Sequence, residues 1–353
     1  MKNIRKIDKN LKKYSFTYKN KIMKKRSYTL ITGSAGFIGY HLTCSLIKKN
    51  KHVIGIDNLN NYYSVKLKKD RIKDLKKTNK KYFIFHKVDL SNKKGIENLF
   101  KKYKITEVIN LAAQAGVRYS ITNPEKYLKS NIIGFHNLID CSIKAKVKIF
   151  IYASTSSVYG KITKTPFSEN LNCSNPIQLY AATKLTNELI AHAYSHLYNF
   201  LTIGLRFFTV YGPWGRPDMA LFKFVDSIKK KKNINVFNYG KHYRDFTYID
   251  DVIKAIISIK TNFRKKFKKN KNYEIYNIGN NKPIFFKNYI KEIEKNLKIK
   301  AKINYLPLQP GDIFKTQADT RKLRNHFGYV SKMNYKKGIK KFIDWHNDYY
   351  QKN

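Results

Sequence analysis

The sequence predicts an α/β fold in which helices cover both faces of a doubly wound parallel sheet, joined to a smaller, interleaved C-terminal α/β lobe. Residues 28–208 alternate short β-branched and aliphatic runs with segments of helical period, as parallel strands with crossover helices require. The first run starts at Tyr28 and enters a turn punctuated by Gly33, Gly36 and Gly39 before a helix begins. A strand, a glycine turn and a helix in this order are typical of Rossmann-type sheets.

The glycine turn is suited to a dinucleotide. Glycine lets the backbone bend sharply and approach a bulky anion, while the unpaired N–H groups and positive dipole end of the helix attract a pyrophosphate. The spacing is G-x-x-G-x-x-G, one residue wider at its start than the usual dinucleotide motif, so a turn that only packs helix on sheet is the alternative. We expect five residues here to bind the cofactor: Gly33, Gly36, Phe37, Ile38 and Gly39.

The charge of the chain is extreme for a globular protein. Its 353 residues are 42% hydrophobic, enough for a buried core, but carry a formal net charge of +49. Such a charge would normally indicate a nucleic-acid or membrane-surface partner. The lysines, however, are scattered along the whole chain among abundant Asn, Ile, Tyr and Phe, all of which codons made only of A and T can encode. We therefore attribute the charge to genome composition and expect no nucleic-acid partner.

Cysteine usage and hydropathy favour a cytoplasmic protein without a membrane partner. Cys44, Cys141 and Cys173 stand far apart without a C-x-x-C pair, so neither a disulfide framework nor a metal site is expected. No apolar run approaches the roughly 20 residues that span a bilayer, and no apolar signal-peptide core is found near the N-terminus. Residues 1–27 form a lysine-rich extension that we expect to be disordered, with a basic targeting segment as the alternative.

The second predicted strand, residues 52–56, ends in Asp57, which lies 18 positions after Gly39 (57 minus 39). This is close to the offset of about 20 residues at which an acidic side chain accepts hydrogen bonds from an adenosine ribose. A carboxylate there also disfavours a 2′-phosphate, so NAD is favoured over NADP. We assign Asn58, the next residue, to the cofactor as well.

Two further strands lead to the same edge of the sheet. Residues 82–88 precede Asp89 and Leu90, and residues 107–111 precede Ala112 and Ala113. Small residues at the carboxyl end of a strand let a cofactor lie across the sheet edge. We assign all four following residues to the cofactor, with a helix N-cap as the open alternative for Asp89.

A fifth strand, residues 148–153, delivers a run of hydroxyl residues, and a helical pattern with Tyr180 and Lys184 follows. Four residues apart, these two side chains share one helix face. An ammonium beside a phenol favours the phenolate and draws its pKa towards the range of a general base. Such pairs arise by chance in many helices, but here the pair follows a glycine turn, an acidic residue and a hydroxyl cluster in that order.

That order resembles the extended short-chain dehydrogenase/reductase family of NAD-dependent epimerases and dehydratases, over essentially all of residues 28–345. The resemblance narrows to the branch that epimerises UDP-glucuronate at C4. It implies an isomerase that converts UDP-glucuronate to UDP-galacturonate with NAD as cofactor, in the biosynthesis of polysaccharides. Four motifs carry it: DNLNNYY at 57–63, AQAGVRYS at 113–120, RFFTVYGPWGRPD at 206–218 and QPGD at 309–312.

The resemblance implies three catalytic residues. Tyr180 as phenolate would remove the proton of the sugar 4-hydroxyl, Thr155 would hydrogen-bond the same oxygen, and Lys184 would tune the tyrosine and hold the nicotinamide ribose. NAD would take the C4 hydride, the 4-keto sugar would rotate while its UDP stays anchored, and the hydride would return to the opposite face. Tyr180 and Lys184 therefore also count as cofactor contacts, and Asn131 is assigned to the cofactor with them.

The resemblance also implies how UDP is anchored. Arginine suits phosphate because its fork donates two parallel hydrogen bonds. For Arg244 the alternative is an ion pair with Asp245 or Asp251. The implied anchor consists of Arg244 at the diphosphate, Phe237 against uracil, Asp312 near the uridine ribose and Arg118 as a further phosphate ligand.

Glucuronate adds a hazard. Oxidation at C4 makes a β-keto acid, which loses carbon dioxide when the bond to its carboxylate aligns with the carbonyl π system. Ser156, Ser157, Thr209 and Arg216 are the expected ligands that hold the carboxylate away from this alignment. Dehydratases of the family carry Asp-Glu in place of the two serines, so this chain lacks the acid and base for water loss. UDP-galactose epimerases generally carry Asn in place of the threonine, which counts against a neutral hexose.

The two lobes are expected to interleave in one compact unit, and the resemblance implies a homodimer packed through helices near 125–145 and 180–198. The expected division is residues 28–208, with 241–280 returning, for the NAD-binding domain, and residues 209–240 and 281–345 for the UDP-sugar-binding lobe.

Other functions stay open. A 4-epimerase of another UDP-hexose or UDP-N-acetylhexosamine, or a UDP-glucuronate decarboxylase, would use the same catalytic residues. A non-catalytic NAD-sensing or nucleic-acid-binding protein could keep the fold, but it would be expected to have lost Thr155, Tyr180 or Lys184, which are intact.

Overall fold

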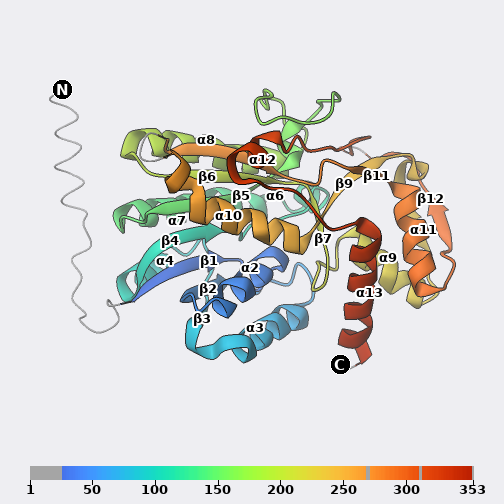
Figure 1. The fold of residues 1–353 in the computed structure, drawn as a ribbon, viewed down its shortest axis with the longest axis horizontal. Helices are drawn as coiled ribbons and strands as arrows, with labels where there is room; N and C mark the ends of the chain where they lie inside the picture. The colour runs from blue at the N-terminus through green and yellow to red at the C-terminus, as the bar shows by residue number, and fades with distance from the viewer. Residues whose placement is uncertain (1–25, 268–270, 310–311, 352–353) are drawn as a thin grey trace.

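A computed structural model describes residues 26–267, 271–309 and 312–351 (Figure 1). Its centre is a seven-stranded sheet in the order β10-β6-β5-β4-β1-β2-β3, with every pairing parallel. The strand order reverses between β1 and β4, so the predicted doubly wound, Rossmann-type sheet is confirmed. The strands are β1 (Ser27–Thr32), β2 (Val53–Asp57), β3 (Phe83–Lys87), β4 (Lys104–Asn110), β5 (Ile149–Thr155), β6 (Thr202–Phe207) and β10 (Tyr273–Ile278).

Helices cover both faces of this sheet. Successive side chains of a strand point to opposite faces, so Ile31 and Ile151 join one buried core while Leu30 and Phe150 join the other. Both faces of each strand are therefore apolar, which is why the strands read as short continuous hydrophobic runs. One face carries α2 (Phe37–Lys48), α3 (Val65–Asn79) and α10 (Ile249–Phe267), and the other carries α4 (Lys93–Lys102), α7 (Gly134–Lys144) and α8 (Leu179–Tyr198).

A smaller lobe lies beside the carboxyl-end side of the main sheet (Figure 1). It holds a three-stranded sheet in the order β11-β9-β7 and a parallel pair, β12 with β8. Its strands are β7 (Thr209–Tyr211), β8 (Ile234–Val236), β9 (Tyr243–Tyr248), β11 (Pro283–Phe285) and β12 (Ile303–Tyr305), and its helices are α9 (Ala220–Lys229), α11 (Phe286–Leu297) and α13 (Tyr335–Gln351).

The interleaving of the two lobes differs in one detail from the expected division. Residues 241–280 were expected to return to the main sheet, but β9 pairs with β7 and β11 in the second sheet, and only α10 and β10 return. The physical reason is that β7 and β11 offer β9 backbone partners on both edges. Of the predicted extension at residues 1–27, positions 1–25 lie outside the described residues. Ser27 already belongs to β1.

Local signals fix several helix boundaries. The Ser64 hydroxyl accepts the Leu67 amide at 3.2 Å and begins α3, and the Asn92 side chain accepts the Gly95 amide at 3.0 Å and begins α4. At the C-terminal end of α8, Asn199 adopts the left-handed conformation, with φ 49°, and ends the helix. Short elements complete the chain: α5 (Tyr119–Thr122), α6 (Pro124–Tyr127), α12 (Arg321–Phe327), the π-helical turn η3 (Leu128–Ile133), and the 3-10 turns η2 (Lys80–Tyr82), η4 (Ser156–Tyr159) and η5 (Phe237–Gly240).

A buried histidine should make the fold sensitive to acid. His346 is 3% exposed among aromatic rings, and neither ring nitrogen has a hydrogen-bond partner within the described residues. Burial is the main cause that lowers the pKa of His346 to about 4. The unfolded chain takes up this proton near pH 6.5 and the folded chain does not, so stability is present above pH 6.5 and is lost as the pH falls towards 4.

We expect His346 to remove about 2 kcal/mol of the free energy of unfolding between pH 7 and pH 5, measured by urea denaturation. His346→Leu should flatten that pH dependence, whereas His196→Leu, at an exposed position of α8, should leave it unchanged. An equal pH dependence in all three proteins would contradict the assignment.

Candidate active site

The carboxyl ends of the central strands and the smaller lobe enclose one cavity of about 880 Å³. Ligands of open α/β sheets bind at this edge, where the strand order reverses. All predicted site residues except Asn131 line it: Gly33, Gly36, Phe37, Ile38, Gly39, Asp57, Asn58, Asp89, Leu90, Ala112, Ala113, Arg118, Thr155, Ser156, Ser157, Tyr180, Lys184, Thr209, Arg216, Phe237, Arg244 and Asp312.

The glycine turn between β1 and α2 leaves no room for side chains. Gly33 has φ +68°, and a Cβ there would lie 2.8 Å from the amide nitrogen of Ala112. A Cβ on Gly39 would collide with the carbonyl oxygen of Gly33, and the Gly36 amide donates to that same oxygen at 2.8 Å. The backbone therefore closes tightly on itself at the wall of the cavity, with the first residues of α2 beside it.

Acidic residues follow β2 and β3, as predicted. Asp57 accepts the Leu59 amide at 2.8 Å, and burial is the main cause that raises its pKa. Asn58 donates from its side chain to Asp89 at 2.9 Å. Burial raises the pKa of Asp89, but hydrogen bonds from Asn58 and Ser91 outweigh it, so its pKa lies below the ordinary value. Asn92, and not Asp89, caps α4, so the N-cap alternative for Asp89 is wrong.

Asn131 supports the cavity wall and does not line it. It lies in η3, where the helix widens into a π turn, and it is 2% exposed. Its side chain accepts the Gln114 amide at 2.8 Å and donates to the Gln114 carbonyl and the Thr183 hydroxyl, both at 3.0 Å. Both polar ends of the Asn131 side chain are thus taken up by the protein.

Gln114, which the sequence analysis quoted in a motif without a role, lines the cavity instead. Its Nε2 is buried and makes no hydrogen bond of ordinary geometry in the part of the chain that the structure describes, although Gln114 is close enough to the Tyr127 hydroxyl to act on the pKa of that phenol. An unpartnered buried amide is costly unless a ligand satisfies it. The tight glycine turn, the carboxylate at the end of β2 and this orphan amide together fit a dinucleotide.

The three expected catalytic residues converge on the cavity from β5 and α8. The Thr155 hydroxyl donates to Ser157 at 3.2 Å, and the Lys184 ammonium donates to Asn187 at 3.2 Å. Burial lowers the pKa of Lys184 to about 8 against the raising effect of Glu188. The ammonium is therefore poised to titrate close to neutral pH.

The electrostatic environment of Tyr180 differs from the expectation. Burial raises its pKa, while Arg216 and a hydrogen bond with Thr155 act in the opposite direction. Lys184 was expected to be the cation that favours the phenolate, but its ammonium is directed to Asn187. Arg216, far away in sequence, supplies the opposing positive charge in this structure.

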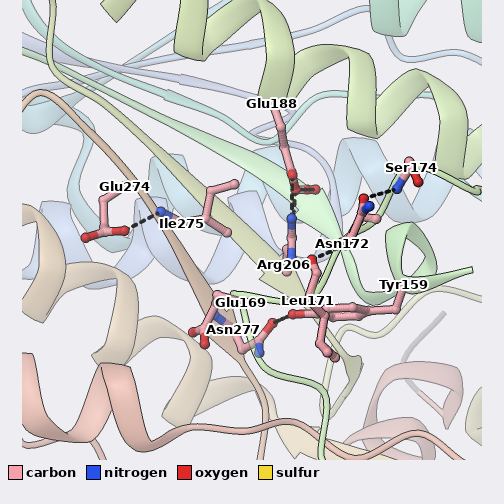
Figure 2. Close-up of polar contacts among 12 residues, drawn as sticks. Tyr159, Glu169, Leu171, Asn172, Ser174, Glu188, Arg206, Glu274, Ile275 and Asn277 are labelled. Atoms are coloured by element: carbon pink, nitrogen blue, oxygen red, sulfur yellow. Dashed lines mark hydrogen bonds and ion pairs between the residues drawn. The ribbon is translucent and has the colours of Figure 1, made fainter. Parts of the chain in front are cut away.

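Glu188 and Arg206, which face each other in Figure 2, form a buried ion pair. Arg206 of β6 donates from Nε and Nη2 to both carboxylate oxygens of Glu188, at 2.9 and 2.7 Å, and the two side chains are 5% and 3% exposed. Ser154 donates to the same carboxylate at 2.5 Å. Since Glu188 follows Lys184 by one helical turn and Ser154 precedes Thr155, this network ties α8 to β5 at the site.

The sugar end of the cavity holds a charged triad that the sequence analysis did not foresee. Arg216 donates from Nε and Nη2 to Asp218, at 3.0 and 2.5 Å, and the Tyr62 hydroxyl donates to the same carboxylate at 3.1 Å. The planar fork of Arg216 is thus already engaged by an internal carboxylate. Both partners lie inside motifs that were quoted, but their spacing along the chain gave no sign of this contact.

At the opposite end, Arg118 meets two residues of the smaller lobe. Its guanidinium carbon lies 4.2 Å from the centre of the Phe237 ring, and its Nη2 lies 3.5 Å from a carboxylate oxygen of Asp312. Residues expected to surround uridine therefore come together from three separate segments. Lys68 and His242 also line the cavity, although the sequence analysis assigned them no role.

Arg244 lines the same region without a carboxylate partner among the described residues. Its Nη1 donates to the carbonyls of Tyr243 and Phe314 at 3.0 and 3.3 Å. Asp245 instead accepts backbone amides of segments 280–281 and 318, and Asp251 accepts amides at 332–333. The ion-pair alternative for Arg244 is therefore wrong.

Across residues 26–267, 271–309 and 312–351, no group of three or more His, Cys, Asp or Glu side chains is arranged to hold a metal ion. No helix in these ranges is both long and apolar enough to cross a membrane.

The sequence is similar to those of several known proteins along most of its length. A protein named CapI from Staphylococcus aureus is 48% identical over 337 residues, which cover 92% of this chain and 99% of the relative. UDP-glucuronate 4-epimerase 4 from Arabidopsis thaliana is 41% identical over 332 residues, covering 91% and 75%.

A solved structure matches the fold as well. The UDP-glucuronic acid 4-epimerase from Bacillus cereus, in complex with UDP-glucuronic acid and NAD, superposes with a TM-score of 0.83 at 32% identity, covering 92% of this chain and 100% of that one. The pattern of the NAD dependent epimerase/dehydratase family matches residues 29–279. The resemblance inferred from the sequence is thus confirmed, and this chain belongs to the NAD dependent epimerase/dehydratase family.

Proposed function

We propose that the protein is an NAD-dependent UDP-sugar 4-epimerase that interconverts UDP-glucuronate and UDP-galacturonate. The observation that carries the proposal is the cavity itself, which Tyr180, Lys184, Thr155 and Arg216 line together with the residues that we assign to the dinucleotide and to UDP. The likeness to UDP-glucuronate 4-epimerases of a plant and a bacterium supports it. NAD, when bound, would supply a reversible acceptor for the hydrogen at C4.

The cofactor would be held by residues of the first half of the chain. The glycine turn of residues 33–39 would surround the pyrophosphate, Asp57 and Asn58 the adenosine ribose, and residues 89–90 and 112–113 the rest of the dinucleotide. Gln114 would donate its free amide to the cofactor.

Tyr180 would move the proton at the sugar 4-oxygen. Its buried phenol has a raised pKa, so it becomes a base only where positive charge stabilises the phenolate. Arg216 supplies part of that charge in this structure, and Lys184 adds to it once it is turned towards the tyrosine. Thr155 would orient the same sugar oxygen through its hydroxyl.

The carboxylate of glucuronate would lie near Ser156, Ser157, Thr209 and Arg216, all of which line the cavity. Because Asp218 engages two nitrogens of Arg216, the guanidinium offers a ligand fewer donors than a free fork would. UDP would be anchored by Arg118, Phe237, Arg244 and Asp312.

The test is to incubate the purified protein with UDP-glucuronate, without added cofactor, and to resolve the products by chromatography and proton NMR. Formation of UDP-galacturonate supports the proposal. Release of carbon dioxide with a UDP-pentose would indicate a decarboxylase instead. Turnover of only UDP-glucose or UDP-N-acetylglucosamine would remove Thr209 and Arg216 from the carboxylate role and leave the catalytic residues unchanged.

We also propose a homodimer, supported by apolar side chains exposed on η3 and α8. Leu128 and Ile133 are 47% and 52% exposed, and Leu189 and Leu197 are 63% and 65% exposed. η3 packs against α8, so these residues belong to adjoining surfaces, and exposed apolar patches mark interfaces. Leu189→Glu with Leu197→Glu should convert a dimer to a monomer in light scattering, whereas Leu308→Glu, 47% exposed in the smaller lobe, should not. A monomeric wild-type protein at micromolar concentration would contradict the dimer.

Free cysteines support a cytoplasmic location as part of the proposal, because Cys44, Cys141 and Cys173 are all unpaired. We also keep the prediction that no nucleic acid is bound. A DNA-binding assay at 50 and 200 mM salt tests it, since binding driven by phosphate contacts would weaken steeply with salt.

A further inference from the structure

The loop between β7 and α9 carries Arg216 and has a strained backbone. Trp214 has φ +58°, a left-handed conformation that bulky side chains rarely adopt. Gly212, two residues earlier, has φ +145°, and a Cβ there would lie 2.6 Å from the Ile249 side chain. Such a conformation persists only where the surrounding structure holds it in place.

Two side chains from the cofactor half hold this loop by three consecutive carbonyls. His41 of α2 lies with Nε2 2.8 Å from the Pro213 carbonyl oxygen. Arg71 of α3 donates from Nη2 to the carbonyls of Trp214 and Gly215, at 2.6 and 3.1 Å. Burial lowers the pKa of His41 to about 4, so the ring is neutral and Nε2 carries the proton that it donates.

The second terminal nitrogen of Arg71, Nη1, reaches the glycine turn. Nη1 donates to the Ala35 carbonyl at 2.8 Å and to the Tyr63 hydroxyl at 2.9 Å. Ala35 lies between Gly33 and Gly36 and is fully buried. One guanidinium therefore joins the turn that faces the cofactor to the loop that carries Arg216.

The chemical setting of Arg71 is unusual. The residue is 0% exposed, and within the described ranges no carboxylate hydrogen-bonds to it, although its charge opposes the rise in the pKa of the nearby Asp57 carboxyl. Burying a cation without a directly paired anion is costly, and an apolar side chain would fill a core position at lower cost. Its acceptors are three backbone carbonyls and one phenol, which indicates that the residue is there to fix backbone segments in relative position.

We propose that Arg71 is a positioning residue that, together with neutral His41, holds the Arg216 loop in a fixed position relative to the glycine turn. The cofactor end and the sugar-carboxylate end of the cavity are thereby fixed relative to each other. The inference rests on the proposed function, because it takes Arg216 as a ligand of the glucuronate carboxylate. The hydrogen bonds from Arg71 and His41 to the carbonyls of residues 213–215 form a clasp on the loop. Without this clasp, the strained Trp214 backbone relaxes and Arg216 leaves its place.

A displaced Arg216 has a chemical consequence. In the 4-keto sugar, the bond between C5 and the carboxylate carbon can break, with its electron pair passing into the enolate of the C4 carbonyl. Carbon dioxide leaves, and a proton from solvent adds at C5, which gives a 4-keto pentose. Loss of these contacts of Arg71 and His41 should therefore shift products from UDP-galacturonate to carbon dioxide and the keto-pentose nucleotide, and each such event leaves the hydride taken from C4 on the cofactor.

The test uses the NAD-loaded protein with Arg71→Lys, which keeps the charge but cannot reach two pairs of acceptors from one nitrogen. We expect the affinity for UDP-glucuronate, measured by calorimetry, to fall at least tenfold, about 1.4 kcal/mol, while the affinity for UDP changes less than twofold. The fraction of carbon dioxide among the products should rise, and the variant should retain less NAD after gel filtration. Lys73→Met, on the exposed face of the same helix, should change none of these.

An equal loss of affinity for UDP-glucuronate and UDP, or no loss of either, would overturn the inference even if the melting temperature falls. Should Arg71→Lys fail to fold, His41→Leu should show the same selective loss, and His41→Gln, which keeps an N–H donor, should restore it. If the wild-type protein binds UDP-glucuronate no better than UDP-glucose, the proposed function fails. In that case, the amount of NAD that Arg71→Lys retains after gel filtration tests the positioning role of Arg71 by itself. Retention equal to that of the wild-type protein would overturn that role.

Discussion

Replacing Tyr180 with phenylalanine should lower kcat for UDP-glucuronate epimerisation on the order of 10³-fold, because the sugar 4-hydroxyl then has no base to accept its proton. The ring is half-buried, and the hydroxyl alone is removed, so packing on α8 is preserved. KM should change little, since Arg244, Phe237 and Asp312, which we propose as the anchor of UDP, are separate cavity residues that the substitution leaves intact. Initial rates by proton NMR measure the effect.

The matched control is Tyr350→Phe, which removes a hydroxyl from a half-exposed position of α13, away from the cavity. It should keep the wild-type kcat. Bound NAD, measured by its absorbance after denaturation, should be equal in both variants and the wild type. A Tyr180→Phe protein that retains its kcat would show that another group takes the proton and would remove the tyrosine from the mechanism.

Replacing Arg206 with methionine should reduce the free energy of unfolding by about 3 to 5 kcal/mol, because it leaves the Glu188 carboxylate buried without its cation. Figure 2 shows how closely the two side chains face each other between β6 and α8. Ser154 also donates to Glu188, but one hydroxyl cannot offset the loss of a bidentate arginine. Urea denaturation at pH 7 measures the change.

The control is the double variant Arg206→Met with Glu188→Leu, which replaces both charges by apolar groups of similar volume. It should recover most of the stability, because a buried ion pair as a whole contributes little once its desolvation is counted. If the single and double variants lose the same free energy, packing at these positions matters and the pairing of charges does not.

Much of the fold follows from local patterns. Strands buried on both faces are continuous apolar runs, so the first five strands of the main sheet could be located from composition and spacing alone. The glycine turn could be placed because Gly33 adopts a left-handed conformation at a close backbone approach, a requirement that only glycine meets easily. Tyr180 and Lys184 could be paired because a helix fixes the geometry of residues four apart. In each case the physical cause acts within a few residues of chain.

Contacts between distant segments could not be predicted in this way. Asp218 binds Arg216 and Tyr62, and its place depends on how the smaller lobe meets the main sheet. The side chain of Asn131 has the donor and acceptor groups of a cofactor ligand, but it lies in a π turn and hydrogen-bonds to the backbone of Gln114 instead. Arg244 stands beside Asp245 in the sequence, yet that carboxylate turns to backbone amides near 280.

The sequence by itself therefore determined the family, the parallel sheet, the glycine turn and many of the residues that line the cavity, because each depends on local backbone requirements or on motifs of fixed spacing. The tertiary structure alone decided which charges meet. Arg71 joins Ala35 to Trp214 and Gly215, which lie 143 and 144 residues further along the chain than Arg71. In the described residues these three carbonyls are its only hydrogen-bond acceptors besides the Tyr63 hydroxyl. Side-chain direction is set by what packs around a residue, and that information becomes available only when distant segments come together.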